Sequence, residues 1–557
     1  MGPLLERAPG ADSRRISEAW FWLISAFMIL VLLVLSMGPG MTVYDEGLVL
    51  YGALKVFHGE LPYRDFWSFY GPGQYYLLAL LFHIFGVFAF LGRAIFIATM
   101  LVSLLVAVKL AWLLGGRRLF GLLAALTALV WVAAAGTYLY PIHPALCLIL
   151  MATLCLVRHW QRGTTRWIAI AGVLIGVTVL FRHDMAMYSV LAICAGEGFY
   201  HLGASGRPIR FRYQELLRDV SVLTGCILIV AGPVILLLLQ HVPVADIRYQ
   251  MFYIPSKIYP GMRHLPFFDF TPGLSFAGRI RYGVDQSFVL VPILVPIAAA
   301  SCLVQKEWKG RQSHWQVSGY VLLLCLALVM PIGAIVRPDL AHVVSALLID
   351  SLLLASLAAR WNLSTRVGQA IIVGATVCFL LSITVQARRA GRGAKATVAL
   401  LAHPGRPGSL LSLCHPPAGL ERVRCMQVGP VEEEEVEYIQ QHTRPGEDVY
   451  SGAGRHDKLF LNDILFYFIS KREAPTKWYY LEPGLETTYA IQKQMIQDLD
   501  SHHVTYVIRN FTWDAVAEPN ESRFSSGVTI LDQYIDANYK PEASFPQILI
   551  LHRATPF

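Results

Sequence analysis

The chain has 557 residues, of which 55% are hydrophobic and 15% are charged, and its formal net charge is +8. Apolar runs near the roughly 20 residues that a bilayer-spanning helix needs recur from Trp20 to Gln386, which excludes an ordinary soluble globular protein. The basic residues stand in short loops between these runs, without a patch of basic and aromatic residues, so their charge does not indicate a nucleic-acid-binding protein.

The first predicted membrane segment is the run from Trp20 to Ser36. It follows Arg14 and Arg15 as a signal peptide would, but no clear small-x-small cleavage site comes after it, so we interpret it as a retained helix. Eleven spans are predicted, at about residues 20–37, 92–114, 119–137, 143–158, 166–182, 185–202, 219–239, 286–304, 316–336, 339–358 and 367–386. Together they predict a transmembrane domain over residues 1–386 of an integral inner (plasma) membrane protein.

The orientation follows from the loops between the spans. The basic clusters around Arg117 and Arg158 fall between alternate spans and therefore share one side, which the positive-inside rule makes the cytoplasm. A further apolar stretch, 75–90, is short and contains His83, and a span there would move those clusters outside. We predict an interfacial or re-entrant helix there, inside a large first outer loop of about residues 38–91.

The part of the chain after Ala387 is polar and lies outside the cytoplasm by the same count. We predict a linker over 387–430 and a small extracytoplasmic α/β domain over 431–557. Helical signals occur at 431–442 and 485–499, and strand signals at 448–450, 504–508 and 547–551. Cys414 and Cys425 could form a disulfide in an oxidising compartment, although their positions in the sequence do not show their geometry.

Charged, aromatic, glycine and proline residues concentrate in the first outer loop. It contains Tyr44-Asp45-Glu46-Gly47, then Pro62-Tyr63-Arg64-Asp65, then Gly71-Pro72-Gly73-Gln74-Tyr75-Tyr76. In this order, the three elements resemble the GT-C superfamily of membrane glycosyltransferases, in particular bacterial protein O-mannosyltransferase and aminoarabinose-transferase-like proteins. The resemblance is strongest over residues 40–95. It continues weakly at Arg182-His183-Asp184 and at Arg337-Pro338-Asp339-Leu340-Ala341-His342.

This resemblance implies a glycosyltransferase that moves a sugar from a polyprenyl-phosphate-linked donor to an acceptor hydroxyl on the extracytoplasmic face. The hydroxyl must lose its proton to a base as it attacks the sugar. The resemblance places that base on Asp45, with Glu46 beside it in a supporting role. By position, the loop 240–285 corresponds to a mobile loop that covers the donor in relatives. The alternative is a structural role, in which Asp45 and Glu46 only cap a juxtamembrane helix.

A lipid-phosphate leaving group needs cationic groups that stabilise its developing charge. Arg182 and Arg337 stand at predicted outer ends of helices, and Arg64 and Arg263 stand in outer loops, although each could instead pair with a nearby acid or a lipid phosphate. Other candidate substrate contacts in these elements are Tyr44, Tyr63, Asp65, Tyr75, His183, Asp184, Asp339 and His342. Aromatic residues at such positions could also serve only as interfacial anchors.

No cofactor is certain from the sequence, but a divalent metal ion could bind on the outer face. The residues predicted to lie there that could converge on an ion are His58, Glu60, Asp65, His183, His264, Asp269 and His342. No spacing among them resembles a dedicated metal site, and a histidine without such a spacing is more often structural.

Two other classes of protein compete with the enzyme. A transporter or flippase of a lipid-linked glycan would keep ionisable residues in the middle of the membrane, where Asp350 is the clearest candidate. A membrane-anchored sensor would work through its tail, but the tail contains no nucleotide-binding loop. The sequence determines neither the sugar nor whether the acceptor is a lipid, a polysaccharide or a protein.

Overall fold

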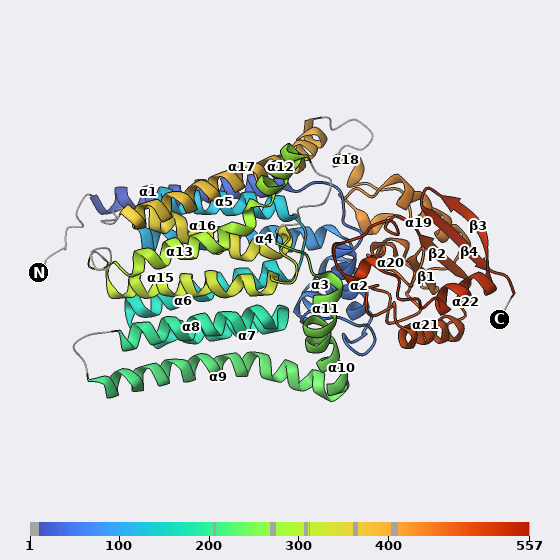
Figure 1. Cartoon of the computed structure of the whole chain (residues 1–557), viewed down its shortest axis with the longest axis horizontal. Helices are drawn as coiled ribbons and strands as arrows, with labels where there is room; N and C mark the ends of the chain where they lie inside the picture. Colours follow the sequence, from blue (N-terminus) through green and yellow to red (C-terminus); the bar gives the residue numbers. More distant parts are fainter. Residues whose placement is uncertain are drawn as a thin grey trace, which may run out of the picture.

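The computed structural model describes residues 10–203, 208–267, 275–305, 310, 312–359, 366–402 and 410–555. Long helices lie side by side in one bundle, and the tail with its strands stacks on one end of that bundle (Figure 1). Short elements lie between the two parts, namely α2 (Asp45–Phe57), α3 (Gly73–Phe85), α10 (Val244–Arg248) and α11 (Tyr259–Arg263). The predicted fold class, a polytopic helical membrane protein with a small C-terminal α/β domain, is confirmed.

Each of the eleven predicted spans is a helix in the structure. They are α1 (Gly10–Ser36), α4 (Phe90–Gly115), α5 (Arg118–Ala135), α6 (Ile142–Arg162), α7 (Thr165–Phe181), α8 (His183–Leu202), α9 (Ile209–His241), α13 (Val291–Leu303), α15 (His314–Val329), α16 (Leu340–Ala358) and α17 (Arg366–Ala402). Among the described residues, eight helices are long and apolar enough to cross a membrane, and a ninth span results if α12 (Phe276–Asp285) and Ser287–Leu303, bent by 52°, count as one. The full number of eleven crossings stays a prediction.

The bundle has a dry centre and a lipid-facing periphery. The apolar window of α16 is 83% buried, whereas that of α9 is only 11% buried, so α9 lies at the edge. Glycines on α7 allow α9 to approach, because a Cβ atom built at Gly172 would lie 2.7 Å from the carbonyl oxygen of Leu223. Such small residues are the usual means of packing helices in a membrane.

The first outer loop folds into two short helices. Helix α3 has 13 residues, about 20 Å at 1.5 Å per residue, and is therefore shorter than the roughly 30 Å hydrocarbon layer. That length agrees with the predicted interfacial or re-entrant helix. Helix α2 packs instead against α20 (Leu465–Ser470) of the tail, where the rings of Tyr51 and Tyr467 stack with centroids 5.0 Å apart. The first loop and the tail thus share one hydrophobic core.

The tail contains one four-stranded sheet in the order β1-β2-β4-β3, with β1 and β2 parallel and the other pairs antiparallel. Its elements after α17 are α18 (Leu410–Leu413), η4 (Glu421–Val423), α19 (Pro430–His442), β1 (Val449–Ala453), α20, α21 (Tyr489–Ser501), β2 (Tyr506–Asn510), η5 (Glu521–Arg523), α22 (Ile530–Asn538), β3 (Tyr539–Phe545) and β4 (Ile548–Arg553).

Most predicted elements of the tail occur near their expected positions, and β3 was not predicted. It carries Lys540, Pro541 and Glu542 and is largely exposed, as an edge strand can be, so its sequence lacks an apolar pattern. Cys414 and Cys425 form a disulfide. Helix α17 continues to Ala402, beyond residue 386 where the change in composition suggested that the membrane domain ends.

Candidate active site

A cavity of about 240 Å³ lies at the end of the bundle that faces the tail. Two helix breaks supply its two arginines: Arg182 stands between α7 and α8, and Arg337 stands between η3 (Met330–Ala334) and α16. η1 (Tyr249–Ile258) and α11 contribute Met251, Pro255 and Tyr259 to its wall. The polar and aromatic residues around the cavity are Phe69, Tyr70, Tyr140, Arg182, His183, Asp184, Tyr188, Tyr259, Arg337, His342 and Ser345.

Arg182 is held by a bidentate ion pair. Its Nε and Nη2 donate to the two carboxylate oxygens of Asp184 at 2.9 and 2.7 Å, and its guanidinium carbon lies 5.7 Å from the centre of the Tyr70 ring. Because the fork geometry fixes the plane of the guanidinium group, the ion pair presents Nη1 in a defined direction. The Arg182 hydrogen bonds to described residues come from Nε and Nη2, so the N–H groups of Nη1 remain for a ligand.

Arg337 is more fully engaged than Arg182. It donates from Nε to Asp339 at 2.9 Å, and from Nη1 and Nη2 to Glu518 of the tail at 2.9 and 2.6 Å. Asp339 also caps α16, accepting from the backbone N–H of His342 at 3.1 Å and from its ring Nδ1 at 2.7 Å. This bond fixes the imidazole and leaves its Nε2 as the ring nitrogen not bound to Asp339.

Asp45 begins α2 beside this cavity, and it does not line the cavity wall. The hydroxyl of Tyr138 donates to its Oδ2 at 2.7 Å, and the Tyr138 ring lies 6.2 Å from that of Tyr140, which lines the cavity. Burial raises the pKa of the Asp45 carboxyl, while the Tyr138 bond and the charges of His342 and Arg337 oppose that shift. Asp45 is therefore within electrostatic reach of the cationic groups of the cavity.

Glu46 has a different environment from its neighbour. It forms a buried ion pair with Arg93, in which Nε and Nη2 donate to the two carboxylate oxygens at 2.5 and 2.8 Å. Arg93 also donates to the carbonyl oxygens of Gly40 and Thr137, each at 2.8 Å. One arginine thus connects Glu46 with the segment before Asp45 and with the segment before Tyr138.

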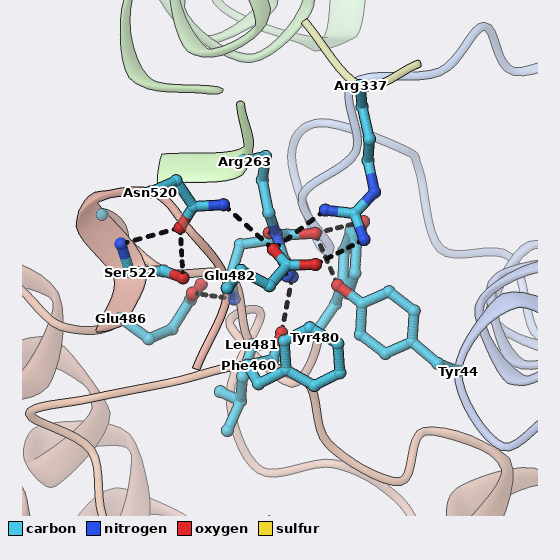
Figure 2. A network of polar contacts seen from close by, with 12 residues as sticks. Tyr44, Arg263, Arg337, Phe460, Tyr480, Leu481, Glu482, Glu486, Asn520 and Ser522 are labelled. Atoms are coloured by element: carbon cyan, nitrogen blue, oxygen red, sulfur yellow. Dashed lines mark hydrogen bonds and ion pairs between the residues drawn. The ribbon is translucent and has the colours of Figure 1, made fainter. Parts of the chain in front are cut away.

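A second network joins the cavity region to the tail (Figure 2). The carboxylate of Glu482 accepts hydrogen bonds from the hydroxyls of Tyr44 at 2.5 Å and Tyr480 at 3.0 Å, and from Nε of Arg263 at 2.8 Å. Arg263 is 5% exposed and also lies 3.8 Å from the Glu518 carboxylate that binds Arg337. Tyr44 and Arg263 therefore fasten α2 and α11 to the tail and do not line the cavity.

Four other predicted site residues lie away from the cavity wall. Tyr63 and Tyr75 are buried in the first loop, where their hydroxyls contact the carbonyl oxygen of Tyr70 at 2.6 Å and the Ser68 hydroxyl at 3.0 Å. Arg64 and Asp65 form an ion pair at the surface, and Asp65 borders a separate open pocket. The structure therefore gives Tyr63 and Tyr75 a supporting position and Arg64 an exposed one.

Several residues of the site were not predicted. Tyr70 begins the Tyr-Gly-Pro-Gly motif, and Tyr138 and Tyr140 interrupt the apolar pattern between two spans, so a local signal existed for these three. Tyr259 lies in the loop 240–285, which the resemblance placed over the donor, and it lines the cavity. Glu518 has no such signal, because tertiary packing alone brings it to Arg337.

The residues with metal-binding chemistry converge elsewhere. Within the described part of the chain, a single group of at least three such side chains forms, and it consists of His159, Glu197, His201 and Asp219. The outer-face candidates do not form such a group among the described residues, and Asp269 lies outside them.

The helical bundle, the helix-break arginines and the capping tail together constitute a GT-C membrane fold. The solved structure of ArnT from Cupriavidus metallidurans in the apo state is similar, with a TM-score of 0.54 and 14% identity over 96% of this chain and 98% of that chain. The same enzyme bound to undecaprenyl phosphate gives a TM-score of 0.49 at 14% identity, over the same shares of the two chains. An apo oligosaccharyltransferase from Archaeoglobus fulgidus gives 0.45 at 13% identity, over 88% of this chain and 69% of that one.

The family model of dolichyl-phosphate-mannose-protein mannosyltransferases matches residues 70–231. Comparison with curated protein sequences gives no match. The fold and the family match confirm the resemblance to the GT-C superfamily of membrane glycosyltransferases that the motifs of the first loop indicated.

Proposed function

We propose that the chain transfers a sugar from a polyprenyl-phosphate-linked donor to an acceptor hydroxyl on the extracytoplasmic face of the membrane. The observation that carries this proposal is the cavity itself: Arg182 and Arg337 reach it from different helices, and the Asp45–Tyr138 pair lies beside it. A phosphate needs cationic groups such as these arginines, and an attacking hydroxyl needs a base such as Asp45.

In the proposed reaction, Asp45 removes the proton of the acceptor hydroxyl while its oxygen attacks the anomeric carbon of the sugar. The bond between that carbon and the phosphate oxygen breaks, and its electron pair leaves with the polyprenyl phosphate. Direct displacement of this kind inverts the anomeric centre. A carboxyl with a raised pKa is a better base near neutral pH than a solvated one, and burial raises the pKa of Asp45.

The leaving phosphate is assigned mainly to Arg182. Its Nη1 is free of Asp184, whereas Nε, Nη1 and Nη2 of Arg337 all bind carboxylates. Arg337 then contributes positive potential and, through Asp339, the orientation of His342. The tyrosines of the cavity wall offer flat faces and hydroxyls of the kind that bind sugars.

Two observations support the donor class and the side of the membrane. The matching family is described by its use of a dolichyl-phosphate sugar, which supports a prenyl-phosphate donor here. The disulfide between Cys414 and Cys425 is of the kind that persists in an oxidising compartment, which supports an extracytoplasmic tail. Membrane lipids surround the bundle, and the acceptor is a hydroxyl of a lipid, a polysaccharide or a protein.

The test is an assay of the purified chain with a panel of prenyl-phosphate sugars and envelope extracts as acceptor. Release of polyprenyl phosphate is compared between the wild type, Asp45→Asn and Asp65→Asn. Asp65 is a matched control, because it is an acid of the same loop whose carboxylate borders the separate pocket. The proposal predicts loss of transfer in Asp45→Asn alone.

Equal transfer by the wild type and Asp45→Asn would refute the base assignment. A transporter would instead release no polyprenyl phosphate and would depend most on Asp350, which is buried in α16. Asp350→Asn in a flux assay with vesicles therefore separates the two classes.

A further inference from the structure

Four side chains with metal-binding chemistry meet at the end of the bundle that lies away from the tail. His159 comes from the last turn of α6, Glu197 and His201 from the end of α8, and Asp219 from the first third of α9. All four are buried, and one ligand atom from each lies within 4.8 Å of the others. Arg182 stands about 28 Å away along α8, so this cluster is separate from the cavity.

The inward-facing atoms are spaced as the ligands of a small ion. Nε2 of His159 and Nε2 of His201 lie 2.9 and 3.0 Å from Oδ2 of Asp219, and Nε2 of His201 lies 3.4 Å from Oε2 of Glu197. Ligands about 2.0–2.1 Å from a tetrahedral zinc ion are about 3.3 Å from one another. These three distances are close to that spacing, and every pair among the four ligand atoms lies within 4.8 Å.

The outward-facing atoms of three ligands are already bound. Nδ1 of His159 lies 3.0 Å from the carbonyl oxygen of Thr164, and Oδ1 of Asp219 accepts from Nε of Arg218 at 2.8 Å. Oε1 of Glu197 accepts from the indole N–H of Trp160 at 3.0 Å. Contacts of this kind hold metal ligands in a fixed orientation and set which histidine nitrogen is free.

One inward-facing atom lacks a hydrogen bond. Oε2 of Glu197 is fully buried and has no hydrogen-bond partner among the described residues, and it lies 3.4 Å from Nε2 of His201. A buried carboxylate oxygen without a hydrogen bond is destabilising unless another group satisfies it. A metal ion between Glu197, the two imidazoles and Asp219 would satisfy it and would neutralise the two buried carboxylates.

We propose that His159, Glu197, His201 and Asp219 bind a zinc ion that fastens the inner ends of α6, α8 and α9. Two imidazoles among four ligands favour zinc, because calcium and magnesium take mainly oxygen ligands and larger coordination numbers. Four protein ligands close the coordination sphere, as in structural rather than catalytic zinc sites.

The position of α9 explains what such a site would do. The buried residues of this helix are Asp219, Leu223 and Ala231, so few of its side chains are fully buried against the bundle. Its far end leads through α10 into η1 and α11, which cover the cavity. A zinc ion at Asp219 anchors the root of that covering segment without contacting the site itself, and it does not depend on the proposed reaction.

The test measures the metal content of the full chain purified in detergent from cells grown with zinc. We expect about one zinc ion per chain in the wild type and less than about a tenth of that in Glu197→Gln and His201→Asn. His342→Asn is the matched control, a histidine of the cavity at the other end of the bundle, and it should retain the zinc. Removing the ion with a chelator should lower the thermal unfolding temperature of the wild type and of His342→Asn. It should leave the unfolding temperatures of Glu197→Gln and His201→Asn unchanged.

A measurement on the wild type alone covers the case in which the variants do not fold. The zinc-depleted chain is titrated with cobalt(II), which absorbs visible light strongly in a tetrahedral site and weakly in an octahedral one. A strong band that zinc removes supports the proposal. Four results would each overturn the proposal: uptake of neither ion, an octahedral spectrum, zinc retained by both Glu197→Gln and His201→Asn, or zinc lost from His342→Asn. Uptake of neither ion would mean that only hydrogen bonds hold the cluster together.

Discussion

Replacing Glu482 by glutamine removes the charge at the centre of the network that joins the tail to α2 and α11. Glutamine has the same shape and can still accept from the hydroxyls of Tyr44 and Tyr480. Its amide N–H groups, however, would face Nε of Arg263, which lies 2.8 Å from the present carboxylate. The substitution therefore leaves a buried guanidinium group without its closest counter-charge.

The size of the effect follows from burial. The side chains of Arg263 and Glu482 are 6% and 7% exposed, and removing one partner of a buried ion pair costs about 3–5 kcal/mol. Arg263 keeps the carbonyl oxygen of Phe460 at 2.6 Å and the carboxylate of Glu518 at 3.8 Å. We therefore expect the lower end, about 3 kcal/mol, or roughly a hundredfold more of the state in which the tail is detached.

Hydrogen–deuterium exchange of the purified chain measures that population. Amides near Tyr44, Arg263 and Glu482 should exchange about a hundredfold faster in Glu482→Gln, if detachment opens them. Arg64→Gln is the control, because the Arg64 side chain is 45% exposed and its pair with Asp65 should contribute at most about 1 kcal/mol. Exchange near Glu482 that stays within about threefold of the wild type would refute the argument from burial.

The other predictions concern the site and the tail. Asp45→Asn should lower turnover by about 10²–10⁴-fold. Burial raises the pKa of Asp45, so ionising this carboxyl opposes folding at pH values above its pKa in the unfolded chain. Thermal unfolding of Asp45→Asn should therefore show no loss of stability. The wild-type rate should fall as the pH decreases through the raised pKa of Asp45. Tyr138→Phe removes a hydrogen bond that lowers this pKa, so the acid limb of its pH–rate profile should move to higher pH. Arg182→Lys keeps the charge but not the fork, so steady-state kinetics should show a larger rise in KM for the donor than fall in kcat. Replacing Cys414 and Cys425 together by serine opens a loop with a sequence separation of 11 and should destabilise the tail in denaturant unfolding by about 3 kcal/mol; equal stability with and without the disulfide would contradict this.

The membrane helices could be predicted from the sequence because their cause is local. A run of about 20 apolar residues satisfies its own backbone hydrogen bonds as a helix, whatever surrounds it. The same reasoning applies to α3, which is too short to span. The patterns of α19, β1, β2 and β4 were visible for another local reason, namely the period with which side chains alternate along a helix or a strand. The order of motifs around Asp45, Arg182 and Arg337 was also visible in the sequence, and the resemblance that it indicated agrees with the fold and with the family model that matches residues 70–231.

Only the tertiary structure decided which of those residues share a site. Asp45 and Glu46 are neighbours in sequence, yet the first contacts Tyr138 beside the cavity and the second is bound by buried Arg93. Glu518 reaches Arg337 across 181 positions of the chain, a contact that no local pattern predicts. Periodicity in a sequence reports which face of a helix is buried, whereas ion pairs between distant segments depend on how those helices pack, and packing is a property of the whole chain.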